Sequence, residues 1–73
     1  MNSSELRILA ITALQKNPET EPENPQWDSL DKLEIISAVH DAFGEKVSDL
    51  TELDNFSDFE SLNEILKNHG LVS

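Results

Sequence analysis

The sequence predicts an all-α fold, a small four-helix bundle built from three main helices and one short helix. Apolar residues recur at spacings of three and four in three segments, residues 4–16, 28–43 and 57–69, which is the period of an amphipathic helix. Proline and glycine lie between these segments, and no useful length of chain alternates as a strand does. With no repeat and no internal boundary, residues 1–73 are expected to form one domain.

The first predicted helix covers residues 4–16. Its apolar stripe consists of Leu6, Leu9, Ala10, Ala13 and Leu14, widened by Ile8 and Ile11. Residues 2–4 can cap its start, and Asn17-Pro18 is expected to end it, because proline cannot donate the next helical hydrogen bond. From Pro18 to Gln26 the chain holds three prolines, three glutamates and no other apolar side chain, which predicts a solvated loop.

The second predicted helix begins at Asp28 or Ser29 and ends at Phe43, where Gly44 can leave the helix in a left-handed conformation. One side of it should face the core: Ile36, Val39 and Phe43, with Ile35 and Ala42 beside them. Leu30, Leu33 and Ser37 form a different stripe, also spaced by three and four residues. Core packing does not account for this second stripe.

The remainder of the chain predicts a short helical turn and a last helix. Val47 and Leu50 precede the turn, which is expected near residues 51–53. The last helix would begin with a capping box in which Ser57 and Glu60 each satisfy a backbone N–H group. Its buried side would hold Phe59, Leu62, Ile65 and Leu66, and Gly70 would end it.

The charge of the chain restricts its partners. Fifteen acidic and five basic side chains give a net charge of −10, which argues against a nucleic-acid partner, since phosphate backbones are bound by Lys and Arg. Basic proteins are the expected partners, and mutual repulsion favours a monomer.

The absence of certain residue patterns limits location and chemistry. The sequence has no cysteine, so it can form neither disulfides nor thiolate metal sites, which suits a cytoplasmic protein. No basic leader with an apolar stretch and no membrane-spanning run occurs, so no membrane insertion is expected. Neither a metal-ligand spacing nor a catalytic triad is present, and we expect a protein that is not an enzyme.

Ser29 is the candidate functional residue, as an attachment point and not as a catalyst. A catalytic serine needs a base and an oxyanion hole, which so small a chain has little scaffold to assemble. A serine at a helix start can carry a phosphodiester, because the helix dipole and the unpaired N–H groups favour negative charge. The alternative is an ordinary first-turn serine that follows Asp28 as the cap.

The second segment resembles the carrier-protein superfamily, the acyl carrier proteins and their peptidyl and aminoacyl relatives. The resemblance rests on Asp28-Ser29-Leu30 followed by Leu33, Glu34, Ile36, Val39 and Phe43-Gly44, and the order of elements matches over nearly the whole chain. It implies a 4′-phosphopantetheine arm on Ser29, added from coenzyme A by a phosphopantetheinyl transferase. The arm's thiol would carry thioesters between a loading ligase and downstream transferases or synthases, which perform the chemistry.

The resemblance also assigns the second stripe to partner contact. Leu30, Leu33 and Ser37 would border the arm and meet partner enzymes, while Asp28, Asp31, Glu34 and Asp41 would pair with basic residues on those partners. Movement of the short third helix would open an apolar pocket for an acyl chain. Many relatives have a longer first loop with an apolar anchor, and Trp27 is expected to plug the end of the bundle in its place.

Two alternatives stay open at this stage. The first is an unmodified carrier-like adaptor that binds through its acidic second helix, for which Ser29→Ala would be harmless. The second is an unrelated acidic helical binding protein, which would bind a basic protein in a salt-sensitive way and would not be modified. For a carrier, the cargo is equally open: fatty acyl, polyketide, aminoacyl and small acyl groups all fit.

Overall fold

The structure, a computed structural model, describes the backbone of residues 1–73 and all side chains except that of Asp54. Its elements are α1 (Ser3–Ala13), α2 (Ser29–Phe43), α3 (Glu45–Ser48), the 3-10 helix η1 (Thr51–Asn55) and α4 (Phe59–Asn68). Among the described residues the strand-like pairing is limited to an isolated bridge between Gln26 and Asp58, so the predicted all-α class is confirmed. None of the helices described has the length and apolar character needed to cross a bilayer.

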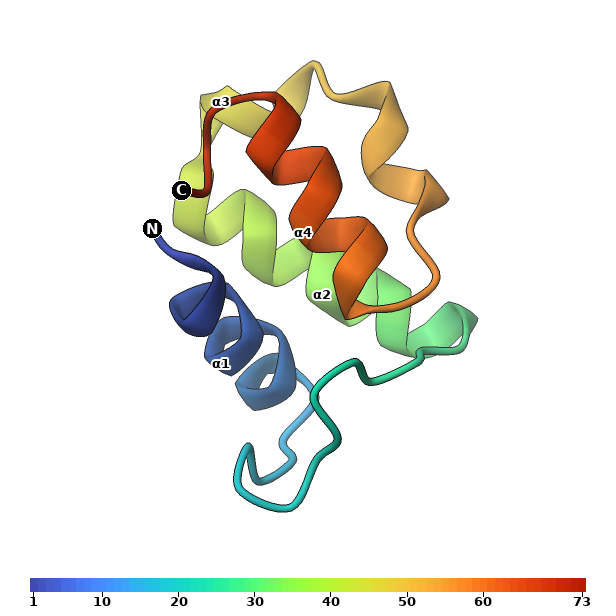
Figure 1. The fold of residues 1–73 in the computed structure, drawn as a ribbon. Helices are drawn as coiled ribbons and strands as arrows, with labels where there is room; N and C mark the ends of the chain where they lie inside the picture. The colour runs from blue at the N-terminus through green and yellow to red at the C-terminus, as the bar shows by residue number, and fades with distance from the viewer.

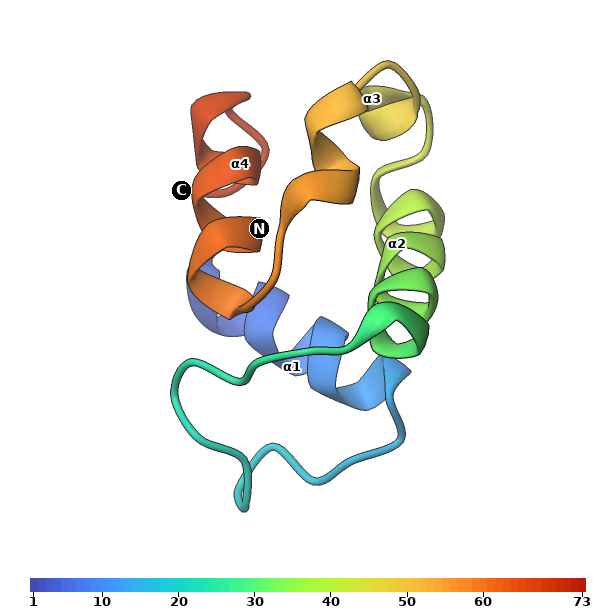
Figure 2. The same cartoon turned by 90° about the vertical axis from the view of Figure 1, so that its right-hand side faces the viewer.

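The helices enclose one core. Figure 1 shows α4 in front of α2, with α1 below them and the two chain ends close together. Figure 2 shows α4 and α2 on opposite sides, with η1 between them, α3 at the upper end of α2 and α1 across the lower end. The main core cluster consists of Leu6, Ala10, Trp27, Ile35, Val39, Val47, Leu53, Phe56, Phe59, Leu62, Leu66 and Val72. Ile11 is also buried.

Two residues assigned to the core by periodicity are exposed instead. Ile8 has an exposed fraction of 51%, because it lies two residues from both Leu6 and Ala10 and therefore projects from the opposite side of α1. Ala42 lies at the margin of the buried side of α2, and its short side chain is exposed there. The predictions for these two side chains were wrong.

The C-terminal end of α1 comes earlier than Asn17-Pro18. The helix ends at Ala13, and Gln15 adopts a positive φ of 60°. Its N–H donates to the Thr12 carbonyl at 2.9 Å, and the Lys16 N–H donates to the Ile11 carbonyl at 3.1 Å. These two bonds form a Schellman motif, in which glycine is the preferred residue at the position of Gln15. Proline is therefore not what stops this helix.

The end of α4 uses the same motif with a glycine. Gly70 has a φ of 74°, its N–H donates to the Lys67 carbonyl at 3.0 Å, and the Leu71 N–H donates to the Leu66 carbonyl at 2.9 Å. The expectation that Gly70 ends the last helix is confirmed.

Gln15→Gly is expected to raise the free energy of unfolding by about 0.5–1 kcal/mol, because glycine adopts the left-handed region without the Cβ clash. Gly70→Gln is the reverse change and should lower it by about 1 kcal/mol. Nothing lies within 4 Å of a Cβ at Gly70, so its effect reports the backbone alone. Urea unfolding checks both, and a lower midpoint for Gln15→Gly would contradict the expectation.

The starts of α1, α2 and α4 are capped by side chains, though not always by the predicted ones. Asn2 caps α1 as expected, accepting from the Glu5 N–H at 2.8 Å. In α4 the cap is Asp58, which accepts from the Ser61 N–H at 2.9 Å, so the predicted Ser57–Glu60 box was wrong. The Ser57 carbonyl accepts from the Trp27 N–H at 3.1 Å, which keeps Ser57 outside the helix.

The segment between α2 and α4 contains more helix than predicted. Gly44 leaves α2 with a positive φ of 61°, as expected, and the predicted turn near residues 51–53 is η1. The short helix α3 was not predicted, because its four residues carry a single buried apolar side chain, Val47. A pattern of three- and four-residue spacings cannot appear in so short a helix.

Candidate functional site

Ser29 is the first residue of α2 and is exposed. Asp28 precedes it in an extended conformation and caps the helix, accepting from the Asp31 N–H at 2.9 Å, while the Asp28 N–H donates to Asp31 Oδ2 at 3.4 Å. The capping is thus provided by the two aspartates. Within the part of the chain that the structure describes, the hydroxyl of Ser29 makes no hydrogen bond.

The other helix-start serine provides an internal comparison. Ser3 is the first residue of α1 and follows a capping Asn2, the position that Ser29 has in α2. Its hydroxyl donates to Asn63 Oδ1 at 3.1 Å, and its side chain is half-buried. The two serines share a helix position but differ in access, because only Ser3 is covered by another helix. Tertiary packing therefore distinguishes Ser29.

The residues just before Ser29 are tied to the start of α4. The Trp27 N–H bonds the Ser57 carbonyl, and the Phe59 N–H donates to the Pro25 carbonyl at 3.0 Å. The Trp27 ring packs edge-on against Phe56, with centroids 5.6 Å apart and an angle of 85° between the planes. Trp27 is buried, as expected for a plug. These contacts hold the approach to Ser29 against the bundle.

The first loop is anchored by an arginine that the sequence analysis did not single out. Arg7 Nη2 donates to the carbonyls of Pro18, Glu21 and Pro22 at 3.2, 2.9 and 2.9 Å. The loop was predicted to be solvated, and several of its side chains are exposed, but its backbone is fixed from α1. In the sequence, this role of Arg7 is indicated only by a basic residue at the edge of an apolar stripe. Such a position does not show which backbone carbonyls the side chain will bond.

Asp58 connects this loop region to α4 and carries a shifted pKa. The backbone N–H and the hydroxyl of Ser61 bond its carboxylate and hold the pKa of Asp58 below its ordinary value of 3.8. Asn24 supports it, with its amide nitrogen 3.4 Å from Asp58 Oδ2. A carboxylate with a lowered native pKa stabilises the fold above the unfolded value of 3.8, and this contribution is lost as pH falls through the native pKa.

Asp58→Asn should therefore weaken the acid dependence of stability. The amide keeps an oxygen that can accept from the Ser61 N–H, but it cannot be protonated in this range. Urea midpoints measured on either side of pH 3.8 are expected to differ less in the variant than in the parent. An unchanged difference would mean that other carboxylates cause the acid sensitivity.

The second stripe of α2 faces outward. Leu30 and Leu33 have exposed fractions of 74% and 64%, and Ser37 is also exposed. An open depression of about 350 Å³ is bounded by Ser29, Lys32, Leu33 and Ile36. The structure thus places Leu33 beside Ser29 and adds Lys32 and Ile36, which lie three and seven residues further along the same side of the helix.

The four acidic residues expected to pair with basic residues of partner enzymes differ in their distance from Ser29. Asp28 and Asp31 bond each other's backbone N–H groups. Glu34 and Asp41 are exposed, and each is three or four residues from both Ala38 and Ser37, so they lie between Ala38 and the second stripe, away from the depression. Lys32 Nζ lies 5.8 Å from the centroid of the Phe56 ring. The immediate surroundings of Ser29 are therefore partly basic.

The arrangement provides an accessible hydroxyl at the N-terminus of a helix. No base among the described side chains bonds the Ser29 hydroxyl. In the same part of the chain, no three His, Asp or Glu side chains gather to hold a metal ion. Comparisons of the chain with profiles of known families, with curated proteins and with solved structures found no match.

Proposed function

We propose that this protein is a stand-alone acyl carrier protein, modified on Ser29 by 4′-phosphopantetheine. The observation that carries the proposal is the exposed Ser29 hydroxyl, without a hydrogen bond to the described residues, at the first position of α2 within Asp28-Ser29-Leu30. The helical bundle supports it, since the elements follow the order that the resemblance implies. The carrier itself is not an enzyme and acts in the cytoplasm.

The residues around Ser29 suit a phosphodiester. The first-turn N–H groups of α2 and the helix dipole favour negative charge at this point, and Lys32 borders the same depression. When bound, the arm supplies a terminal thiol that forms thioesters with the cargo. The chain's own residues position the attachment point, while Leu33 and Ile36 offer an apolar surface next to it.

Partner enzymes would dock on the outward side of α2. Leu30 and Leu33 provide exposed apolar area, and the carboxylates of Asp28, Glu34 and Asp41 would attract basic residues on a transferase, a ligase or a synthase. Asp31 and Ser37, the other two residues predicted to contact partners, are also on α2. Because these charges are at the surface, they steer the encounter, and their effect weakens with salt.

The test is the intact mass of the purified protein before and after incubation with coenzyme A and a broad-specificity phosphopantetheinyl transferase. We expect a gain of one phosphopantetheine unit. No gain with several transferases would favour the unmodified adaptor or acidic binding protein, which the exposed Leu30 and Leu33 amid acidic residues also suit.

A further inference from the structure

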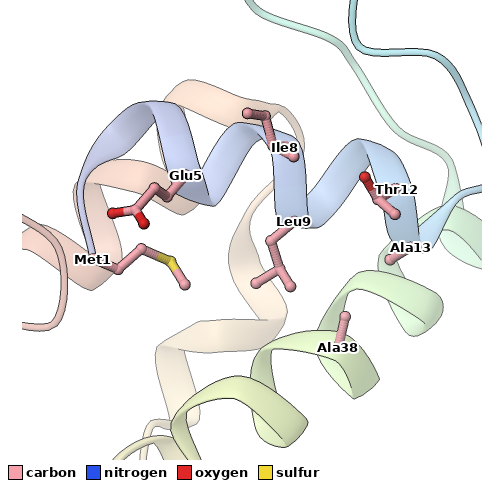
Figure 3. Close-up of a pocket in the computed structure, with 7 residues that line it drawn as sticks. All are labelled: Met1, Glu5, Ile8, Leu9, Thr12, Ala13 and Ala38. Atoms are coloured by element: carbon pink, nitrogen blue, oxygen red, sulfur yellow. The ribbon is translucent and has the colours of Figure 1, made fainter.

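A second surface of the molecule lies between α1 and α2. It is an open groove of about 530 Å³ with Ile8, Leu9 and Ala13 on α1, Met1 at one end and Ala38 on α2. Figure 3 shows Leu9 and Ala13 pointing toward α2, with Ala38 facing them, while Ile8 lies on the upper side of α1. The walls are thus mainly apolar.

The groove accounts for large apolar side chains that are exposed and not packed in the core. Ile8 and Met1 have exposed fractions of 51% and 43%, and both border the groove. Leu6 and Ala10 on the same helix are fully buried, so α1 has one apolar side for the core and a second apolar side open to solvent. The molecule's other large exposed apolar side chains, Leu30 and Leu33, lie on the outward side of α2.

The rim of the groove is acidic. Glu5 lines it, and its carboxylate lies near Met1 in Figure 3. Glu34 and Asp41 are exposed next to Ala38 on α2, between it and the stripe of Leu30 and Ser37. No basic side chain lines the groove among the described residues. The apolar floor and the acidic rim are complementary to a partner with an apolar stripe flanked by Lys or Arg.

We propose that this groove binds an amphipathic helix with basic flanks, contributed by a partner protein. The α1 residues that line the groove run from Glu5 to Ala13, which is roughly 12–14 Å at 1.5 Å per residue and matches about two and a half turns of a docked helix. Apolar side chains of that helix would cover Ile8, Leu9 and Ala38, and its Lys or Arg residues would meet Glu5, Glu34 and Asp41.

A second copy of this chain fits the groove poorly. Each copy carries a net charge of −10, and a symmetric contact over Ile8 would bring the Glu5 carboxylates of the two copies toward each other. The groove also lies on a different side of α2 from Ser29 and Leu33. A partner bound there would leave the Ser29 hydroxyl accessible, so this inference does not depend on the proposed modification.

The test uses a fluorescent model peptide that, as a helix, carries leucine on one side and lysine on the other. The peptide is titrated with the protein, and binding is followed by fluorescence anisotropy. Ile8→Glu should weaken binding by about tenfold or more, because it places a buried charge in the apolar contact. Glutamate is a good helix former and Ile8 is exposed, so circular dichroism should show an intact fold. Leu30→Glu makes the matched change on the outward side and should leave affinity unchanged.

Three outcomes would overturn the proposal. Affinity that neither Ile8→Glu nor Leu30→Glu weakens would indicate binding by net charge alone, since each variant adds a negative charge to a chain that already carries −10. Weakening by Leu30→Glu alone would place the peptide on the outward side of α2. Self-association of the parent that Ile8→Glu abolishes would assign the groove to a second copy. Ser29→Ala should bind the peptide with the affinity of the parent. The binding result is therefore independent of whether Ser29 is modified.

Discussion

Ser29→Ala is expected to abolish the gain of mass when the protein is incubated with coenzyme A and a phosphopantetheinyl transferase. The expected loss is complete, because alanine has no oxygen to form the phosphodiester. The substitution removes a hydroxyl that bonds no described residue, and Asp28 and Asp31 cap the helix without it. Circular dichroism and the urea midpoint should therefore match those of the parent.

Ser3→Ala is the matched control, since Ser3 is also the first residue of a helix behind a capping side chain. Its hydroxyl bonds Asn63, so the variant should lose a little stability, about 1 kcal/mol, and be modified as the parent is. A mass gain in Ser29→Ala equal to that of the parent would mean that the attachment point is a different serine, and peptide mapping would identify it.

Phe56→Ala is expected to have the largest effect on stability. Phe56 is fully buried, and its ring packs against Trp27 beside the approach to Ser29. Removing a buried phenylalanine ring costs about 3–5 kcal/mol, whereas a domain of this length has a total stability of roughly 4–11 kcal/mol. The variant should unfold at a much lower urea concentration, which the fluorescence of the single tryptophan can follow.

Leu33→Ala is the surface control for this measurement. Leu33 has an exposed fraction of 64%, so its truncation creates no cavity and should change the free energy of unfolding by about 0.5 kcal/mol or less. If Leu33→Ala destabilised the protein as strongly as Phe56→Ala, the outward stripe of α2 would have to be packed against another part of the fold. Its assignment as a docking surface would then be untenable.

The sequence predicted what depends on neighbours along the chain. The span of α2 follows from Asp28 at its start, Gly44 at its end and the spacing of Ile35 and Val39 between them. The outward position of Leu30 and Leu33 follows from the same period, and the Asn2 cap is also a local interaction. Ser29 was predicted as the candidate attachment residue from a tripeptide and its helical context, and its role as an attachment site awaits the mass measurement.

Features that depend on contacts distant in sequence were decided by the tertiary structure. Ser3 and Ser29 have the same local setting, and only the packing of α4 against α1 covers one hydroxyl and leaves the other open. Arg7 donates to backbone carbonyls of the first loop, and Ser57 is kept out of α4 by its hydrogen bond with Trp27.

Ile8 was predicted as a core residue because periodicity shows which positions of a helix are apolar. It does not show how much of the helix surface the neighbouring helices cover. The groove between α1 and α2 exists for that reason, since burial is a property of the packed bundle and not of any one helix.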